Sequence, residues 1–376
     1  MSSAGHKPLR VLRLYFRYPP EPGGMEQHIE RLSEAQRQLG VEVLNVFNRG
    51  QSSASSAIQL LPGVDLGVLR PQALRNAAFY AAAAASAKVR RWATSGSGPL
   101  VVHAHGAWSD FLFARWLAAF LGANATVGTI HSPTEKQRMR PVHNLALRQL
   151  GAIFATGRRE YSSARSVVGE RAIHLPSAPS DLFYRQFDRP TAREFDIVCV
   201  GKLVPVKRIN LVLEAAHRLP MRTFAIIGDG PEWTALQRQQ AELRLQNVTF
   251  FGRLAPEQVR NVLLGARLFL STSVEEGTPT SVLEAMAMGL PVIVTPSNDY
   301  DWLIEPGING TITSGWSVDE IVASIDQALN NDALWLPSVL ESNRLKLQSI
   351  TWDANAAKVT QIMQHCVQAP SLGATL

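Results

Sequence analysis

The chain has 376 residues, of which 46% are hydrophobic and 18% are charged, and it carries a formal net charge of +6 at pH 7. This length is enough for two or three domains that each bury a core, and the lack of an apolar run of about 18 residues predicts no membrane-spanning helix. The basic balance favours a polyanionic partner, which leaves a nucleotide phosphate, an anionic membrane surface and nucleic acid open.

Two features bear on where the protein resides. The amino-terminal residues lack the apolar core and small-residue cleavage site of a signal peptide, and the only cysteines are Cys199 and Cys366. So few cysteines argue against a disulfide framework and fit a reducing compartment. We therefore expect a cytoplasmic protein.

Short apolar segments rich in Val, Ile and Leu alternate with helical segments along the chain, which predicts parallel sheets covered by helices on both faces. Strands are expected at 9–16, 41–47, 100–105, 126–131 and 152–157, and again at 195–201, 223–228, 248–252, 268–272 and 291–295. A polar stretch at 184–194 separates the two series. The fold class is therefore α/β with two doubly wound, Rossmann-like domains, and a ligand is expected in a central cleft at the carboxyl ends of the strands.

Glycines follow the first strand. Gly23 and Gly24 precede a helix, so their backbone could approach a ligand while the helix directs free N–H groups at a phosphate. The alternative is a plain turn after two prolines, and a short glycine motif does not decide between them.

The second half offers two further loops at strand ends. Lys202 and Lys207 flank a short loop after a strand that ends at Gly201, and lysine suits phosphate oxygens. Lys207 could equally be a solvated surface charge. The turn at Gly228 in IIGDGPEW is similar to half of a dinucleotide-binding fingerprint.

An acidic segment precedes an apolar helix near residue 280. Thr278 is expected to cap this helix, with Pro279 in the first turn and the amides of Thr280 and Ser281 free. Glu276 then lies before the helix and Glu284 inside it, so the two carboxylates can serve opposite ends of an elongated ligand. A carboxylate in an apolar helix needs partners, and the two hydroxyls of a ribose would supply them.

Taken in order, these segments resemble the retaining glycosyltransferases of the family 4 type. The resemblance covers nearly the whole chain and rests on Gly23-Gly24 with Glu26, TIHS with His131, the loop from Gly201-Lys202 to Lys207, IIGDGPEW, NVTFFGRL, the E-x7-E segment from Glu276 to Glu284, and the closing helix after Thr351-Trp352. It implies the GT-B fold. We expect an acceptor-binding domain at 1–186, a donor-binding domain at 187–350, and a helix within 351–376 that returns to the first domain.

The resemblance also implies roles for single residues. Glu284 would bind the nucleotide ribose, and Lys202 with Lys207 the diphosphate. Glu276 and His131 would contact hydroxyls of the donor sugar near the reacting carbon.

Other residues complete the two substrate sites that the resemblance implies. Gly24 would donate a backbone N–H to the phosphate, and the backbone near Arg253 would approach the base. Glu26 and His105 are assigned to the acceptor side. The remaining donor-binding residues are Gly23, Gly228, Gly277, Thr278, Pro279, Thr280 and Ser281. Arg208 replaces a glycine that is common in the family, and the segment at 297–305 departs from the pattern on the sugar side, which leaves the donor sugar open.

No metal cofactor is expected. Asp299-Tyr300-Asp301 spells the D-x-D of metal-dependent transferases of another fold, but this pattern arises easily by chance and the lysines can do the work of a cation. His103 and His105 lack a cluster of further ligands nearby in the sequence, so we favour an acceptor-side or structural role for them.

The expected partners are a nucleotide-diphosphate sugar, UDP- or GDP-linked, and a glycan or lipid-linked acceptor, with no nucleic acid. The aromatic segment at 108–123 and the basic segment at 135–150 predict peripheral binding to an anionic membrane, at the inner face of the plasma membrane. A helix that packs on its own sheet explains the aromatic segment equally well.

The leading function is transfer of a sugar from such a donor to a hydroxyl acceptor, for a lipid-linked glycan or a cell-surface polysaccharide precursor. The alternatives are a nucleotide-sugar epimerase of similar architecture and a non-catalytic sugar-nucleotide-binding subunit. A glycosidase with Glu276 and Glu284 as its acid pair would not need phosphate-binding elements.

Overall fold

A computed structural model describes residues 7–19, 24–131, 140–184, 193–297, 300–330 and 332–369. The chain divides into two compact units, Met1–Ser177 with Trp352–Leu376 and Ala178–Thr351, and each is described by itself. The predicted domain boundary at 186–187 and the polar stretch around it lie largely outside the described residues. The return of the chain to unit 1 at Trp352 follows from this division.

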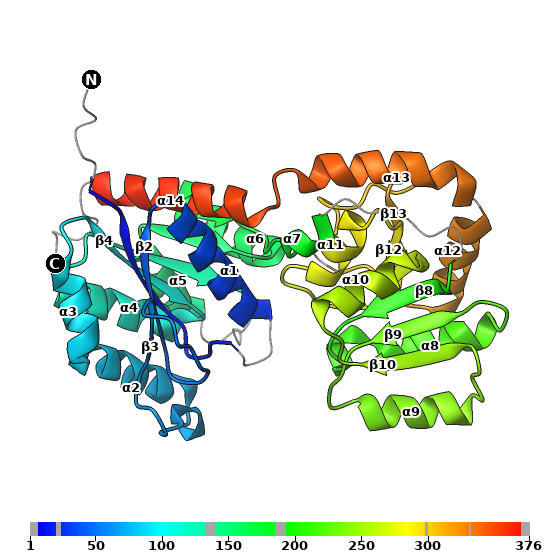
Figure 1. Cartoon of the computed structure of the whole chain (residues 1–376), viewed down its shortest axis with the longest axis horizontal. Coiled ribbons are helices and arrows are strands. Elements are labelled where there is room, and N and C mark those ends of the chain that lie inside the picture. Colours follow the sequence, from blue (N-terminus) through cyan, green and yellow to red (C-terminus); the bar gives the residue numbers. More distant parts are fainter. Residues whose placement is uncertain are drawn as a thin grey trace. The chain divides into compact units, whose positions relative to one another are not determined.

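Unit 1 is built on a parallel sheet of seven strands in the order β3-β2-β1-β4-β5-β6-β7 (Figure 1). Its strands are β1 (Arg10–Leu14), β2 (Glu42–Phe47), β3 (Ala57–Gln59), β4 (Leu100–His105), β5 (Ala125–Ile130), β6 (Ala152–Ala155) and β7 (Ala172–His174). The helices are α1 (Gly24–Gln38), α2 (Gln72–Ala85), α3 (Ala87–Ser95), α4 (Trp108–Leu121), α5 (Arg140–Arg148), α6 (Arg158–Val168) and α14 (Trp352–Gln368), with short 3-10 turns at Leu66–Val68 and Gly169–Arg171.

Helix α14 completes unit 1, although it is far from the rest of that unit in sequence. It packs along α1, where the Gln36 side-chain amide donates to the Thr360 hydroxyl at 2.9 Å. The Asn355 side chain donates to the carbonyl of Pro176 at 2.8 Å. Trp352, Ala356, Val359 and Met363 are buried, and their spacing of three or four residues places them on one face of the helix.

Unit 2 has a parallel sheet of six strands in the order β10-β9-β8-β11-β12-β13. The strands are β8 (Phe195–Val200), β9 (Phe224–Ile227), β10 (Val248–Gly252), β11 (Ala266–Ser271), β12 (Val292–Val294) and β13 (Gly310–Ile312). The helices are α7 (Asp181–Tyr184), α8 (Ile209–Arg218), α9 (Trp233–Glu242), α10 (Pro256–Leu264), α11 (Thr280–Ala287), α12 (Val318–Asn330) and α13 (Asp332–Leu347), with the 3-10 turn η4 at Pro205–Lys207.

All ten strands expected from the sequence are present. They are mostly apolar because helices cover both faces of each sheet. Strands β1 and β4 are buried along their whole length, with Arg10, Arg13, His103 and His105 as polar exceptions. The sequence reading missed β3, β7 and β13, each only three residues long. All three are edge strands, and a short, partly exposed edge strand carries no long apolar run.

Strand order reverses once in each sheet, between β1 and β4 in unit 1 and between β8 and β11 in unit 2. At such a point the connections leave toward opposite sides, so the loops at the carboxyl ends of the two strands diverge and leave a crevice where ligands of open α/β sheets bind. The fold therefore directs attention to the loops after these four strands.

Candidate active site

In unit 2, the loops after β8 and β11 are joined at the point where the strand order reverses. The hydroxyl of Thr272 donates to the carbonyl of Lys207 at 2.8 Å, and the amide of Val274 donates to the carbonyl of Val206 at 3.0 Å. Arg208 begins helix α8 with φ at +49°, a left-handed conformation that favours glycine. The glycine that the family resemblance implies at this position would adopt this conformation without strain.

Lys207 and Glu276 form an ion pair between these two loops. The side chains are 20% and 10% exposed, respectively, so the pair is largely shielded from water. Lys207 is therefore not the freely solvated surface charge that was the alternative reading. Lys202, by contrast, is exposed, and among the described residues its only hydrogen bond is to the backbone, where its carbonyl accepts the amide of Val204 at 2.9 Å.

Glu284 lies in the middle of α11. Burial raises the pKa of its carboxyl to about 8, although the residue as a whole keeps intermediate exposure. Among the described residues, no hydrogen bond or ion pair engages this carboxylate. This carboxyl group can accept hydrogen bonds from a ligand, because no described group of the protein already bonds to it.

The start of α11 differs from the expectation. The helix begins at Thr280, and Pro279, with ψ at 70°, is its N-cap without a side-chain hydrogen bond. Thr278 therefore does not cap the helix. The amide of Thr280 is not free either, because it donates to the carbonyl of Thr278 at 2.9 Å in a tight turn. Within the described part of the chain, the amide of Ser281 has no partner.

The glycines and the arginine that the sequence assigned to donor binding differ in their exposure and backbone conformation. Gly228 has φ at +150°, and a Cβ there would lie 1.8 Å from the carbonyl oxygen of Gly201, so glycine is required for the loop after β9 to pack on the loop after β8. Arg253 and Gly24 are exposed, and Gly277 lies between the ion-paired Glu276 and the α11 turn. Gly23 lies outside the described residues.

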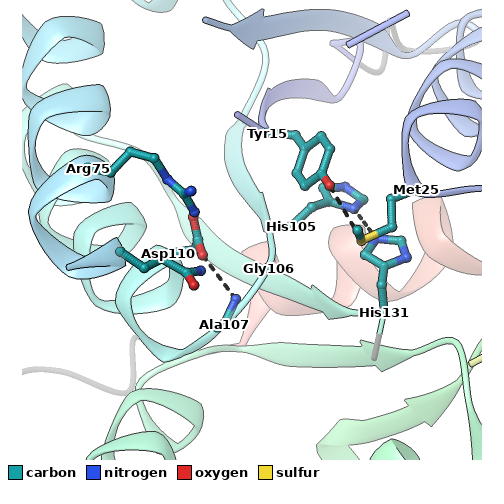
Figure 2. Close-up of a pocket in the computed structure, with 9 residues that line it drawn as sticks. Tyr15, Met25, Arg75, His105, Gly106, Ala107, Asp110 and His131 are labelled. Carbon is teal, nitrogen blue, oxygen red and sulfur yellow. Dashed lines mark hydrogen bonds between the residues drawn. The ribbon is translucent and has the colours of Figure 1, made fainter. Parts of the chain in front are cut away.

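In unit 1, a cavity of about 150 Å³ lies at the carboxyl ends of β1 and β4, where the strand order reverses (Figure 2). It is lined by Tyr15, Met25, Gln72, Arg75, His105, Gly106, Ala107, Asp110 and His131. His105 Nδ1 lies 2.9 Å from His131 Nε2. The sequence thus predicted both histidines of this cavity.

These histidines are neutral at physiological pH. Burial lowers the pKa of His131 to about 3 and lowers that of His105 well below its usual value. A neutral imidazole can donate from one nitrogen and accept at the other, and the contact between the two rings uses one nitrogen of each. A ligand can therefore use the remaining nitrogen of His131.

A buried polar network behind the cavity was missed by the sequence reading. Arg13, on β1, donates from Nε to His103 Nδ1 at 3.3 Å. Because arginine can only donate, His103 Nδ1 must be unprotonated, so the proton lies on Nε2, which is 2.7 Å from the Thr129 hydroxyl. An arginine inside an apolar strand was the signal that could have revealed this network.

His28, on α1, is the other residue that was missed. Its Nδ1 lies 2.8 Å from the Ser177 hydroxyl, and its ring meets the ring of His131 edge-on with centroids 4.8 Å apart. Nitrogens of His28, His105 and His131 lie within 4.8 Å of one another, so these side chains could hold a metal ion. No local pattern pointed to this group, because the three residues come from distant segments.

Two further expectations concern acidic residues. Glu26 is fully buried and pairs with Arg17 Nε at 2.9 Å, and it does not line the cavity, although its neighbour Met25 does. In the D-x-D segment, Asp299 lies outside the described residues, Tyr300 is buried with its hydroxyl 3.2 Å from that of Ser271, and Asp301 is exposed. Tyr300 thus has a place in the core.

Comparisons with known proteins agree with this architecture. Residues 183–344 match the family model described as glycosyl transferases group 1, and residues 22–175 match the model of glycosyltransferase family 4. The chain is similar to the GDP-mannose-dependent alpha-(1-6)-phosphatidylinositol monomannoside mannosyltransferase of Mycolicibacterium smegmatis, with 26% identity over 66% of this chain and 72% of the relative. A phosphatidylinositol N-acetylglucosaminyltransferase component of Arabidopsis thaliana is 24% identical over 94% of this chain and 81% of the relative.

Solved structures show the same fold. A sucrose-phosphate synthase from Thermosynechococcus elongatus superposes with a TM-score of 0.76 at 18% identity, covering 96% of this chain and all of that chain. HepE of Anabaena, solved with UDP, has a TM-score of 0.74 at 16% identity over 95% of this chain and all of that chain. The two units are thus the Rossmann-like domains of the GT-B fold. With both of its halves matched by models of the same enzyme class, the chain belongs to the group 1 glycosyltransferases of family 4.

Proposed function

We propose that this glycosyltransferase moves a sugar, with retention of its anomeric configuration, from a nucleoside-diphosphate sugar to a hydroxyl of a lipid-linked acceptor. The assignment of the donor site rests on the loops after β8 and β11, where the strand order of unit 2 reverses. There a shielded lysine, Lys207, accompanies the Glu284 carboxyl, which has no partner among the described residues. The cation suits a diphosphate and the carboxyl suits the paired hydroxyls of a ribose.

The Lys207 ion pair has a consequence for donor binding. When a diphosphate approaches Lys207, its oxygens compete with Glu276 for the ammonium group. Glu276 can then turn its hydrogen-bonding capacity to the hydroxyls of the donor sugar. Lys202, which is exposed in the same loop, and the unpartnered amide of Ser281 add donors for the phosphate oxygens.

The chemistry needs charge stabilisation more than a strong base. Breaking the bond between sugar and phosphate builds negative charge on the leaving diphosphate, and fixed positive groups aimed at it lower the barrier. In the retaining mechanism, the acceptor hydroxyl attacks from the face that the leaving group departs, and the departing phosphate takes its proton. His131 is neutral and contributes a hydrogen bond to the sugar rather than a charge.

The acceptor is assigned to the cavity of unit 1, whose polar lining suits a hydroxylated ring. The relatives named above act on phosphatidylinositol-based lipids, and others are named D-inositol 3-phosphate glycosyltransferases. By analogy, we propose that the acceptor of the present chain contains phosphorylated inositol. UDP and GDP are the candidate nucleotides, since HepE was solved with UDP and one relative uses GDP-mannose.

Transfer of radiolabelled sugar tests this function. Purified protein is incubated with UDP- and GDP-linked hexoses and with phosphatidylinositol in mixed micelles, and the lipid product is separated and counted. His131→Ala should fold normally, bind nucleoside diphosphate like the wild type and transfer sugar at least about a hundredfold more slowly, because a contact that strengthens in the transition state is lost. Lys207→Ala should instead weaken nucleotide binding. A wild-type transfer rate for His131→Ala at saturating donor, or wild-type nucleotide affinity for Lys207→Ala, would refute the assignment.

A further inference from the structure

The cavity of unit 1 has two chemically different ends (Figure 2). His105, His131, Tyr15 and Met25 form one end, and Arg75 and Asp110 form the other. In the proposed function, His131 contacts the donor sugar, so the reacting hydroxyl of the acceptor belongs near the histidines. Whatever part of the acceptor extends away from that hydroxyl meets Arg75.

Arg75 is half-buried, yet most of its hydrogen-bonding capacity is unused. Its Nε lies 3.4 Å from the side-chain oxygen of Asn76, a long contact, and its guanidinium carbon lies 4.8 Å from the ring centroid of Phe16. In the described part of the structure, no carboxylate forms an ion pair with it and its two terminal nitrogens have no hydrogen-bond partner. A guanidinium of this kind offers two parallel donors to an anionic oxygen pair.

Asp110 is anchored by its own backbone contacts, and its charge interacts with the Arg75 guanidinium without a direct ion pair among the described residues. Its Oδ2 accepts the amide of Ala107 at 3.0 Å at the start of α4. Gly106, with φ at +144°, allows this position, because a Cβ there would lie 2.3 Å from the same oxygen. Asp110 can thereby accept a hydrogen bond from a polyol hydroxyl, while the terminal nitrogens of Arg75 keep their donors for a ligand.

Gln72 lies on the same face of α2 as Arg75, because the two residues are three apart. Its side-chain amide lines the same cavity and adds a neutral donor beside the guanidinium. The Phe16 ring supports the guanidinium from the other side, which limits its freedom. The arrangement combines a fixed cation, a neutral donor and a carboxylate.

From this juxtaposition we propose that Arg75 binds a phosphate group of the acceptor, so that the enzyme selects acceptors with an anionic phosphate beside the hydroxylated ring. The inference rests on the proposed function and adds to it the residue that distinguishes charged from neutral acceptors. The phosphate can belong to a soluble phosphorylated polyol or to a lipid headgroup.

Calorimetry on the full chain with saturating UDP or GDP tests this with two probes that differ only by the phosphate group, myo-inositol 3-phosphate and myo-inositol. The wild type should bind the phosphorylated probe more tightly. Arg75→Gln should lose about tenfold or more of that affinity, the usual worth of a hydrogen bond to a charged group, and should bind myo-inositol like the wild type. Arg91→Gln removes the same charge from an exposed site on α3 outside the cavity and serves as the matched control.

Radiolabel transfer to soluble myo-inositol 3-phosphate and to phosphatidylinositol in vesicles then distinguishes the two sources. Arg75-dependent transfer to either one supports the proposal and identifies the acceptor. Equal affinity of the wild type for the two probes, or wild-type affinity of Arg75→Gln for the phosphorylated probe, overturns it. Nucleotide affinity, measured in the same samples, separates this failure from failure of the proposed function, in which the wild type itself would bind no nucleoside diphosphate.

Discussion

At the scale of single residues, the ion pair between Lys207 and Glu276 predicts how a change at Glu276 affects nucleotide binding. Glu276→Gln removes the carboxylate that competes with a diphosphate for Lys207. Nucleoside diphosphate should then bind up to about fivefold more tightly, since a partly exposed pair contributes up to about 1 kcal/mol, while sugar transfer falls. Calorimetry with UDP and GDP measures the first effect and the transfer assay the second.

The control for this variant is Glu257→Gln, which removes a similar charge from the exposed start of α10. It should change neither quantity. Weaker nucleotide binding by Glu276→Gln would mean that Glu276 contacts the nucleotide directly instead of competing with it.

Glu284 links the donor site to stability. Its folded-state pKa of about 8 is raised above the ordinary 4.5 by burial, so between these values the folded state holds a proton that the unfolded state has released. Stability must therefore fall as the pH rises through this range. Glu284→Gln removes the titrating group, and it should be more stable than the wild type at pH 8.5 and lose most of that advantage at pH 4.5.

Urea unfolding without nucleotide at the two pH values measures this difference. Glu242→Gln, at the exposed end of α9, is the control and should show no pH-dependent gain. A gain for Glu284→Gln that is the same at both pH values would show that this carboxyl does not titrate abnormally. Glu284→Gln should also bind nucleotide more weakly, so the carboxyl that favours nucleotide binding lowers the stability of the free protein at high pH.

At the scale of elements, α4 has a buried face and an exposed aromatic face. Phe111, Ala114, Leu117 and Ala118 are buried against unit 1, which accounts for packing on its own sheet. Trp116 and Phe120 are 48% and 55% exposed and stack with ring centroids 5.9 Å apart. Leu145 of the neighbouring helix α5 is 55% exposed as well. None of the helices in the described ranges has the length and apolar character needed to cross a bilayer.

We expect this exposed face of α4 to bind a membrane surface. Replacing Trp116 and Phe120 together by serine should weaken binding to anionic vesicles about tenfold or more, because apolar surface that enters the lipid interface is lost. Leu39→Ser, at an exposed site just after the end of α1, is the control. Cosedimentation with neutral and anionic vesicles at low and high salt measures the effect. Equal binding of wild type and double variant would assign these rings another role.

The basic segment proposed to assist this binding is only partly described. Residues 135–139 lie outside the described ranges, whereas Arg148 is exposed at the end of α5. Salt sensitivity of vesicle binding therefore tests the contribution of charge, at about 1 kcal/mol for each basic residue near the surface.

At the scale of the whole molecule, the metal requirement can be tested on the intact enzyme. Because Lys207 and Lys202 supply positive charge at the proposed diphosphate site, transfer should be unchanged in EDTA. The group of His28, His105 and His131 is a separate place where a metal could bind. Rates before and after dialysis against chelator decide the matter, and a loss that Mn²⁺ or Mg²⁺ restores would contradict the expectation.

Local patterns in the sequence were sufficient for the elements and for much of the chemistry. Strands buried on both faces are predominantly apolar, so β1, β4, β8 and β11 could be recognised one by one. Glu284 stood out because a carboxylate inside an apolar helix is costly to bury without a partner. Lys207, Glu276 and His131 stood out in the loops and strand ends expected to face the cleft. The short edge strands and the cap of α11 left no comparable signal, since Pro279 and Thr278 suit more than one turn.

The tertiary structure decided which of these residues meet. Strand order places the loops after β8 and β11 side by side, and with them Lys207 and Glu276, which are far apart in sequence. It likewise brings Arg75 of α2 to the cavity beside His105 and His131. Such long-range pairings depend on how helices pack across the sheet, and no local propensity encodes that packing. The sequence by itself therefore determined the class of fold and the residues proposed to react, and the tertiary structure determined their partners, their protonation and the shape of the cavity in unit 1.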